Sequence, residues 1–162
     1  SRCQIVRFAP LLYEDMKSKS QAPEWALRSS QGSFEKLSLL FDKDEMEVRS
    51  QAIYCLRRLK LDPWAYLDPE VKVGFRDRSQ ALRLSQHMAL LLRDSVYWKI
   101  GEKTKILNAD QDKLFEELCR VDSGDLIETS IRALQLENFL LQNRDPSLVF
   151  EEFWLKTSWR AH

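Results

Sequence analysis

The chain has 162 residues, of which 44% are hydrophobic and 31% are charged, and its formal net charge is zero. This length suits one domain, or one domain with an extension, and the apolar fraction is enough for a core. A zero net charge does not favour nucleic-acid binding, which needs a basic surplus or at least a basic face. The low counts of four Gly and five Pro favour helices over tight hairpins.

The first third of the chain predicts an arm followed by three helices. Residues 1–21 form the arm, which either has little structure of its own or docks on a partner through apolar side chains, namely Ile5, Val6, Phe8, Leu11 and Leu12. Pro23 and Gly32 bound a short helix, and Ser33 precedes a second helix over 34–41. The third helix begins after Asp44, with Glu47 at the capping-box spacing. Its apolar stripe is Val48, Ala52, Cys55, Leu56 and Leu59.

The middle of the chain contains two Asp-Pro pairs, which are typical helix starts. They are 62–63 and 68–69, and Gly74 is expected to break the segment that the second pair starts. A longer helix is predicted over 77–92. Asp94 and Ser95 are expected to cap a further helix that contains Trp98, and 101–108 reads as a polar connection.

Residues 108–162 predict a helical C-terminal extension. One helix starts at Asp110 or Asp112, and 122–125 interrupts it. Another runs over 126–143, with Ile127, Ile131, Leu134 and Leu141 expected to face inward. The last begins at Asp145-Pro146, and its apolar face is Val149, Phe150, Phe153 and Trp154. No stretch alternates as a strand, so the predicted fold is all-α, an irregular multi-helix arrangement.

The sequence offers no candidate catalytic, cofactor-binding or metal-binding residue. His87 stands beside an apolar stripe and His162 ends the chain, and a lone His on a helix usually has a structural role. Phosphate-loop, dinucleotide-binding and nucleophile-elbow motifs are missing from the sequence. Helix capping or solubility accounts for the carboxylate clusters, which are Asp42, Asp44, Glu45 and Glu47, and then Glu116 and Glu117. The sequence therefore predicts that this chain has no enzyme active site of its own.

Several remaining features each leave two interpretations open. The basic residues Arg76, Arg78 and Arg83 form either a solvated face or a docking site for an acidic protein surface or lipid headgroups. The five Trp serve either the core or a partner surface.

The apolar helices at 34–41 and 149–154 predict more apolar surface than one small core can bury. The isolated chain is therefore expected to associate.

Cysteine spacing and hydropathy limit the kinds of site and membrane attachment. Cys3, Cys55 and Cys119 are odd in number and widely spaced, without a CxxC pair, which argues against a zinc site. Cys55 and Cys119 lie on apolar helix faces and are expected to be buried thiols. No apolar run approaches the roughly 20 residues of a membrane-spanning helix, so any membrane contact is expected to be peripheral.

Residues 31–59 carry a motif of Gly, Phe, Lys, Leu and Leu, then acidic residues, then Val, Ala and Arg-Arg-Leu. The residues that match are Gly32, Phe34, Lys36, Leu37, Leu39, Asp42, Asp44, Glu45, Glu47, Val48, Ala52, Arg57, Arg58 and Leu59. This motif resembles the opening of subunit 7 of the mitochondrial cytochrome bc1 complex, also called the ubiquinone-binding-protein subunit. Further on, Asp77-Arg78, Arg83, Leu84, Ala89, Leu90 and Trp98 are similar to that family in order and approximate spacing.

The resemblance covers a core over residues 22–107 and has no counterpart in residues 108–162. Ser38 stands where the family has Gly, and 64–74 looks like an insertion. The resemblance implies a non-catalytic, all-helical structural subunit without a cofactor. It also implies a peripheral position on the matrix side of the mitochondrial inner membrane, against cytochrome b and the core proteins. The alternative from a different class is a soluble helical adaptor unrelated to respiration.

Overall fold

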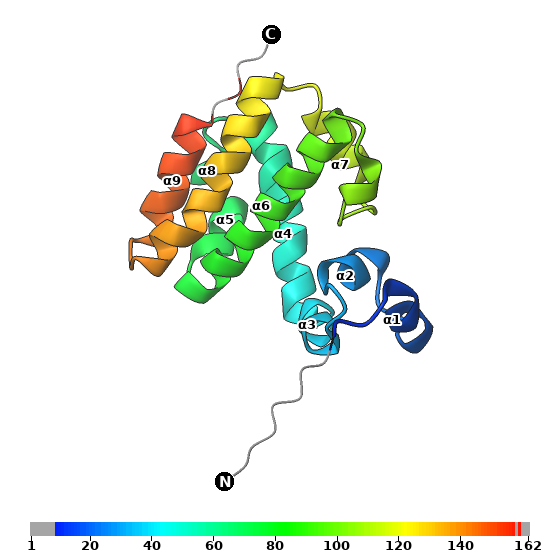
Figure 1. Cartoon of the computed structure of the whole chain (residues 1–162). Helices are drawn as coiled ribbons and strands as arrows, with labels where there is room; N and C mark the ends of the chain where they lie inside the picture. Colours follow the sequence, from blue (N-terminus) through cyan, green and yellow to red (C-terminus); the bar gives the residue numbers. More distant parts are fainter. Residues whose placement is uncertain (1–8, 158, 160–162) are drawn as a thin grey trace.

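The structure is a computed structural model that describes residues 9–157 and residue 159, and in this part of the chain every regular element is a helix (Figure 1). The predicted all-α fold is confirmed. The α-helices are α1 (Tyr13–Lys19), α2 (Glu24–Ser29), α3 (Phe34–Leu40), α4 (Lys43–Leu61), α5 (Pro69–Lys72), α6 (Arg78–Lys99), α7 (Asp112–Leu118), α8 (Ser123–Leu141) and α9 (Pro146–Lys156). Short 3₁₀ turns, η1 to η3, lie at Ala65–Leu67, Val73–Phe75 and Lys103–Lys105.

The main core surrounds α6, which packs against α4 and against α8, while α9 covers α8. Five α6 side chains on the core face are completely buried, namely Ala81, Leu84, Met88, Leu91 and Leu92. Each buried Leu contributes about 2 kcal/mol relative to an exposed one. Because the same hydrophobic cluster also contains Leu114, Leu136 and Trp154, helices α7, α8 and α9 pack as part of this core.

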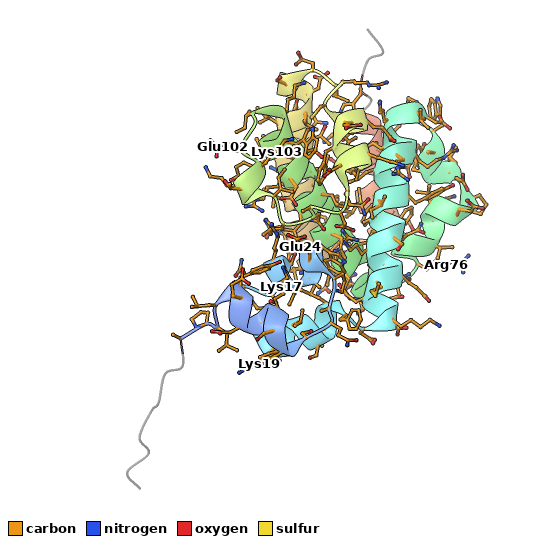
Figure 2. All side chains as sticks on the ribbon, turned by 90° about the vertical axis from the view of Figure 1, so that its right-hand side faces the viewer. Lys17, Lys19, Glu24, Arg76, Glu102 and Lys103 are labelled. Carbon is orange, nitrogen blue, oxygen red and sulfur yellow. The ribbon has the colours of Figure 1, made fainter. Side chains whose placement is uncertain are left out.

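A second, smaller hydrophobic cluster holds α1, α2 and α3 together at one end of the molecule. Its buried members are Met16, Trp25, Ala26, Leu27 and Leu37. Figure 2 shows this end, with Lys17 and Lys19 on α1, below the helices of the main core. Residues 1–8 of the predicted arm lie outside the described residues, but 13–19 form a helix that buries Met16. This segment is therefore part of the fold.

The start of α4 differs from the sequence-based prediction. The N-cap residue is Asp42, which has an extended backbone and makes no side-chain capping bond, and Asp44 lies in the first helical turn. The prediction that Asp44 caps this helix is wrong. Because Phe41 and Asp42 form the turn after α3, the chain is already helical at Asp44. The carboxylates of Asp44 and Glu45 still stand at the positive end of the helix dipole.

The long helix α6 continues through Asp94 and Ser95 to Lys99, so the prediction of a new start at these residues is wrong. The Ser95 hydroxyl donates to the Leu91 carbonyl one turn back, at 2.8 Å. The Asp94 carboxylate accepts hydrogen bonds from the backbone N–H groups of Leu107 and Asn108. Asp94 therefore caps the connection after η3, where Ile106 and Asn108 are buried, and this connection is not wholly a polar surface loop.

Helix α8 begins at Ser123, where Asp122 accepts from the backbone N–H groups of Gly124 and Asp125. The expected inward stripe is wrong, because four of its residues are 48–62% exposed, namely Ile127, Ile131, Leu134 and Leu141. The buried face consists of Leu126, Thr129, Ala133, Leu136 and Leu140. Two apolar stripes at helical spacing fit this sequence, and packing on α6 and α9 selects the one that is buried.

Helix α9 begins as predicted, with Asp145 accepting from the Leu148 N–H at 3.0 Å and Pro146 in the first turn. Its apolar face is buried in the chain's own core, where Phe150 stacks on Phe75 with 4.8 Å between ring centroids. The prediction that this face is surplus is therefore wrong. None of the helices described combines the length and apolar character needed to cross a bilayer.

Candidate docking groove

An open groove of about 710 Å³ follows the outward face of the first half of α4. One wall is the turn between α3 and α4, and the other comes from α5 and the 3₁₀ turn after it. Its lining consists of Phe41, Lys43, Met46, Glu47, Ser50, Gln51, Tyr54, Glu70 and Val73. The groove therefore lies within the stretch that carries the family resemblance, apart from its last two residues.

The periodicity of α4 explains why these side chains share a face. Met46, Ser50 and Tyr54 recur every four residues, while Val48, Ala52 and Cys55 of the opposite face are buried. The far wall is tied to α4 by hydrogen bonds from Gln51 Nε2 to the Glu70 carbonyl at 2.6 Å and from Tyr54 to the Glu70 carboxylate at 2.7 Å. The groove is thus formed without a partner.

The lining side chains of the groove suit the binding of another molecule, and none of them is an activated nucleophile. Phe41, Met46 and Val73 are 49%, 39% and 37% exposed and provide apolar surface. Glu47 and Glu70 are carboxylates, and Lys43 is the one cation among the lining residues. The hydrogen bond to Glu70 raises the pKa of Tyr54, so the phenol stays protonated and serves as a donor.

A buried polar cluster lies on the other side of α4, against α6. Glu45 Oε1 lies 2.7 Å from Nε2 of His87, and Arg83 contacts the second carboxylate oxygen at 3.3 Å. The hydrogen bond with His87 is the main reason that the pKa of Glu45 falls below its ordinary value, with Arg83 acting in the same direction. Burial of Glu45 opposes that shift.

The polar cluster continues through Arg49 to the connection after α6. Arg49 is buried, donates to Asn108 Oδ1 at 3.2 and 3.0 Å, and pairs with Asp110 at 2.7 Å. Its guanidinium also lies over the Trp25 ring, 4.1 Å from the centroid. Asn108 in turn donates to Asp94, which is completely buried. Burial is the main cause that raises the pKa of Asp94.

Imidazole paired with carboxylate can perform acid–base chemistry in an open site, but this pair is enclosed. His87 is 5% exposed, the Trp25 ring packs against it in a T-shaped arrangement with 6.3 Å between ring centroids, and Arg83 occupies the other oxygen of Glu45. Trp25 belongs to the smaller hydrophobic cluster, and His87 lies on α6 of the main core. The polar cluster therefore connects the two hydrophobic clusters of the molecule.

The basic residues and cysteines considered in the sequence do not come together in one site. Arg76 is exposed, Arg78 donates to the Leu140 carbonyl, and Arg83 joins the polar cluster, so these three do not form one basic face. Cys55 is buried, which raises its pKa to about 12, and Cys119 is half-buried. Cys3 and His162 lie outside the described residues. Within 9–157 and 159, no three His, Cys, Asp or Glu side chains are arranged to hold a metal ion.

The five Trp divide between core and surface. Trp25 and Trp154 are buried, Trp98 and Trp159 are half-buried, and Trp64 is 61% exposed.

The contact between Glu45 and His87 was not predicted from the sequence, in which the two residues are 42 positions apart. One available signal was the spacing of four residues between Glu45 and Arg49 and between Arg83 and His87, which places each pair on one side of its helix.

Comparison with known proteins leaves the family open: no protein-family model matches the chain, and no curated protein or solved structure matches it either.

Proposed function

We propose that this chain is a non-catalytic structural subunit of a membrane-bound protein assembly, and that its groove receives an apolar segment of a partner subunit carrying basic residues. The observation that carries this proposal is a preformed apolar groove on the stretch that resembles the bc1 subunit. Within that stretch, Leu37, Val48 and Ala52 are buried in the chain's own clusters. The same stretch also leaves large apolar side chains exposed, namely Phe34, Leu39, Phe41 and Met46.

The charges of the groove favour a basic partner segment. Two carboxylates, Glu47 and Glu70, and one ammonium group, Lys43, line it, so a Lys or Arg on the partner gains more than an acidic residue. Met and aromatic side chains provide an adaptable contact surface, and both residue types are enriched at protein interfaces. The exposed Phe41 and Met46 fit the apolar side of such a segment.

The resemblance supports a specific assembly, the mitochondrial cytochrome bc1 complex. In this proposal the chain lies on the matrix side of the inner membrane, where it contacts cytochrome b and the core proteins. Its role is to stabilise the assembled complex, and electrons do not pass through it. Loss of the chain should therefore reduce the amount of complex without slowing turnover in the complex that remains.

The test uses the full chain, tagged, in its native host in place of the wild-type copy. Met46→Lys puts an ammonium group into the groove, where it replaces apolar surface and repels a basic segment, and Leu155→Lys on α9, at a residue 46% exposed and outside the groove, is the matched control. The amount of chain that co-purifies with haem b in mild detergent is measured, together with quinol–cytochrome c reductase activity per mole of haem b. We expect Met46→Lys to lower the assembled complex several-fold at constant specific activity, and Leu155→Lys to behave as wild type.

Three results would contradict the proposal. They concern the assembly, the non-catalytic role and the docking site in turn. A chain that does not travel with haem b would overturn the respiratory assignment and favour the soluble adaptor. A normal amount of complex with low specific activity would indicate a direct part in catalysis. Equal effects of the Met46 and Leu155 variants would show that the groove is not the docking site.

A further inference from the structure

The exposed apolar stripe of α8 has the spacing of a coiled-coil seam. Ile127, Ile131, Leu134, Asn138 and Leu141 are separated by four, three, four and three residues, which is the alternation of a and d positions in a heptad repeat. All five side chains are exposed. In this register Ile131 and Asn138 occupy a positions, and Ile127, Leu134 and Leu141 occupy d positions.

From this seam we infer that α8 pairs with α8 of a second copy of the same chain, in a parallel two-stranded contact. Ile131 at an a position, with Leu134 and Leu141 at two of the three d positions, favours two strands over three or four. Asn138 at an a position also fits, because a single buried Asn specifies the register of a parallel pair at some cost in affinity. In a parallel pair the two Asn138 side chains meet, whereas an antiparallel pair would place each against an apolar residue.

The residues that flank the seam are compatible with a copy of themselves. In a parallel pair each g position faces the following e position of the partner helix. Ser130 then faces Gln135, and Glu137 faces Gln142, so no two like charges meet. The charged neighbour Glu128 already pairs with Arg132 of its own helix at 2.5 Å.

Packing within the monomer leaves the seam free and the helix ordered. The opposite face of α8, with Leu126, Ala133 and Leu136, is buried, and Figure 1 shows α6 and α9 on either side of α8. A two-heptad peptide would not be helical on its own. Here the tertiary fold has already ordered the helix, which lowers the entropic cost of pairing.

The length of the seam sets the strength of the contact. Fifteen residues of helix span about 22 Å, and an interface of that size belongs to the weak, transient class that buries less than about 1,200 Å². We therefore expect a dimer that forms in a concentration-dependent way, between about 10 µM and 1 mM. This inference uses no residue of the groove and does not depend on the proposed respiratory role.

The test is sedimentation of the full chain over that concentration range. We expect wild type to shift from monomer to dimer, and Leu134→Glu to remain a monomer with an unchanged melting temperature, since Leu134 is 61% exposed. Leu148→Glu on α9, where Leu148 is 65% exposed, is the matched control and should dimerise as wild type does. Asn138→Leu should strengthen association at least tenfold, because it removes the polar a position.

Orientation is tested separately by disulfide trapping. Asn138→Cys should give an oxidised dimer in a parallel pair, whereas Leu148→Cys should give no more than wild type. A wild-type chain that stays monomeric at 1 mM, or equal loss of dimer in the Leu134 and Leu148 variants, would overturn the inference. Dimers that cross-link through 148 and not through 138 would overturn it as well.

Discussion

Glu45 Oε1 and His87 Nε2 lie 2.7 Å apart across the contact between α4 and α6. Arg83 contacts the other oxygen of the carboxylate, and the Trp25 ring packs against His87 in a T-shaped arrangement. Two packing units with separate hydrophobic clusters therefore meet at buried polar groups, and stability should depend on the charge of these groups.

Glu45→Gln should make stability less sensitive to acid. The folded-state pKa of Glu45 lies below its ordinary value of 4.5. The carboxylate therefore contributes stability above that pH, and this contribution is lost as the pH falls through the folded-state pKa. Asp94, whose pKa is raised, acts in the opposite direction in both proteins, so its contribution cancels in the difference between them. Urea unfolding from pH 3 to pH 7 measures the effect, and parallel curves would contradict this assignment.

Arg49→Met should lower the free energy of unfolding by about 3 kcal/mol, because it leaves buried acceptors without their donor. Arg49 is 7% exposed and contacts Asn108, Asp110 and the Trp25 ring. Arg57→Met is the control, since Arg57 and Glu117 are 44% and 43% exposed and 3.7 Å apart. Exposed pairs contribute less than about 1 kcal/mol. Equal losses in urea unfolding would show that the buried contacts of Arg49 carry no special weight.

Gly32→Ala should cost more than Gly101→Ala, although both glycines have a positive φ, of 82° and 81°. A methyl group at Gly101 meets open space, so its cost is the left-handed strain of about 1–2 kcal/mol. A methyl group at Gly32 would clash with the Leu11 backbone, whose N–H donates to the Gly32 carbonyl at 3.0 Å. The difference between the two melting temperatures measures that contact. Equal shifts in melting temperature would mean that the segment before α1 moves away from the added methyl group without measurable cost.

Asp77→Ala should lower the free energy of unfolding by about 1 kcal/mol through the loss of the α6 N-cap. Asp77 accepts from the backbone N–H of Gln80 at 2.9 Å. Asp44→Ala is the comparison, since Asp44 lies inside the first turn of α4. It should lose only its interaction with the helix dipole, a few tenths of a kcal/mol. Denaturant midpoints distinguish the two variants. A larger loss at Asp44 would restore it as the cap.

The sequence alone determined the helical class and several helix ends. Ser33 and Asp145 accept from backbone N–H groups three residues later, and such capping contacts depend only on neighbours within one turn. Local chemistry of this kind can be recognised without knowing which helices meet. The same reasoning was wrong at Asp44, because the turn after α3 already starts the helix with Asp42 as its N-cap. It was also wrong at Asp94, whose carboxylate accepts from the backbone N–H groups of Leu107 and Asn108.

Only the tertiary structure decided which faces are covered. Helix α8 has two apolar stripes, and the sequence does not distinguish the buried one from the one that holds Leu134, because both have helical spacing. The contact of Glu45 with His87 likewise depends on where α4 crosses α6. The groove exists because Gln51 and Tyr54 donate hydrogen bonds to Glu70, which lies 19 and 16 residues further along the chain. Contacts between distant segments depend on the packing of whole helices, and no local pattern records them.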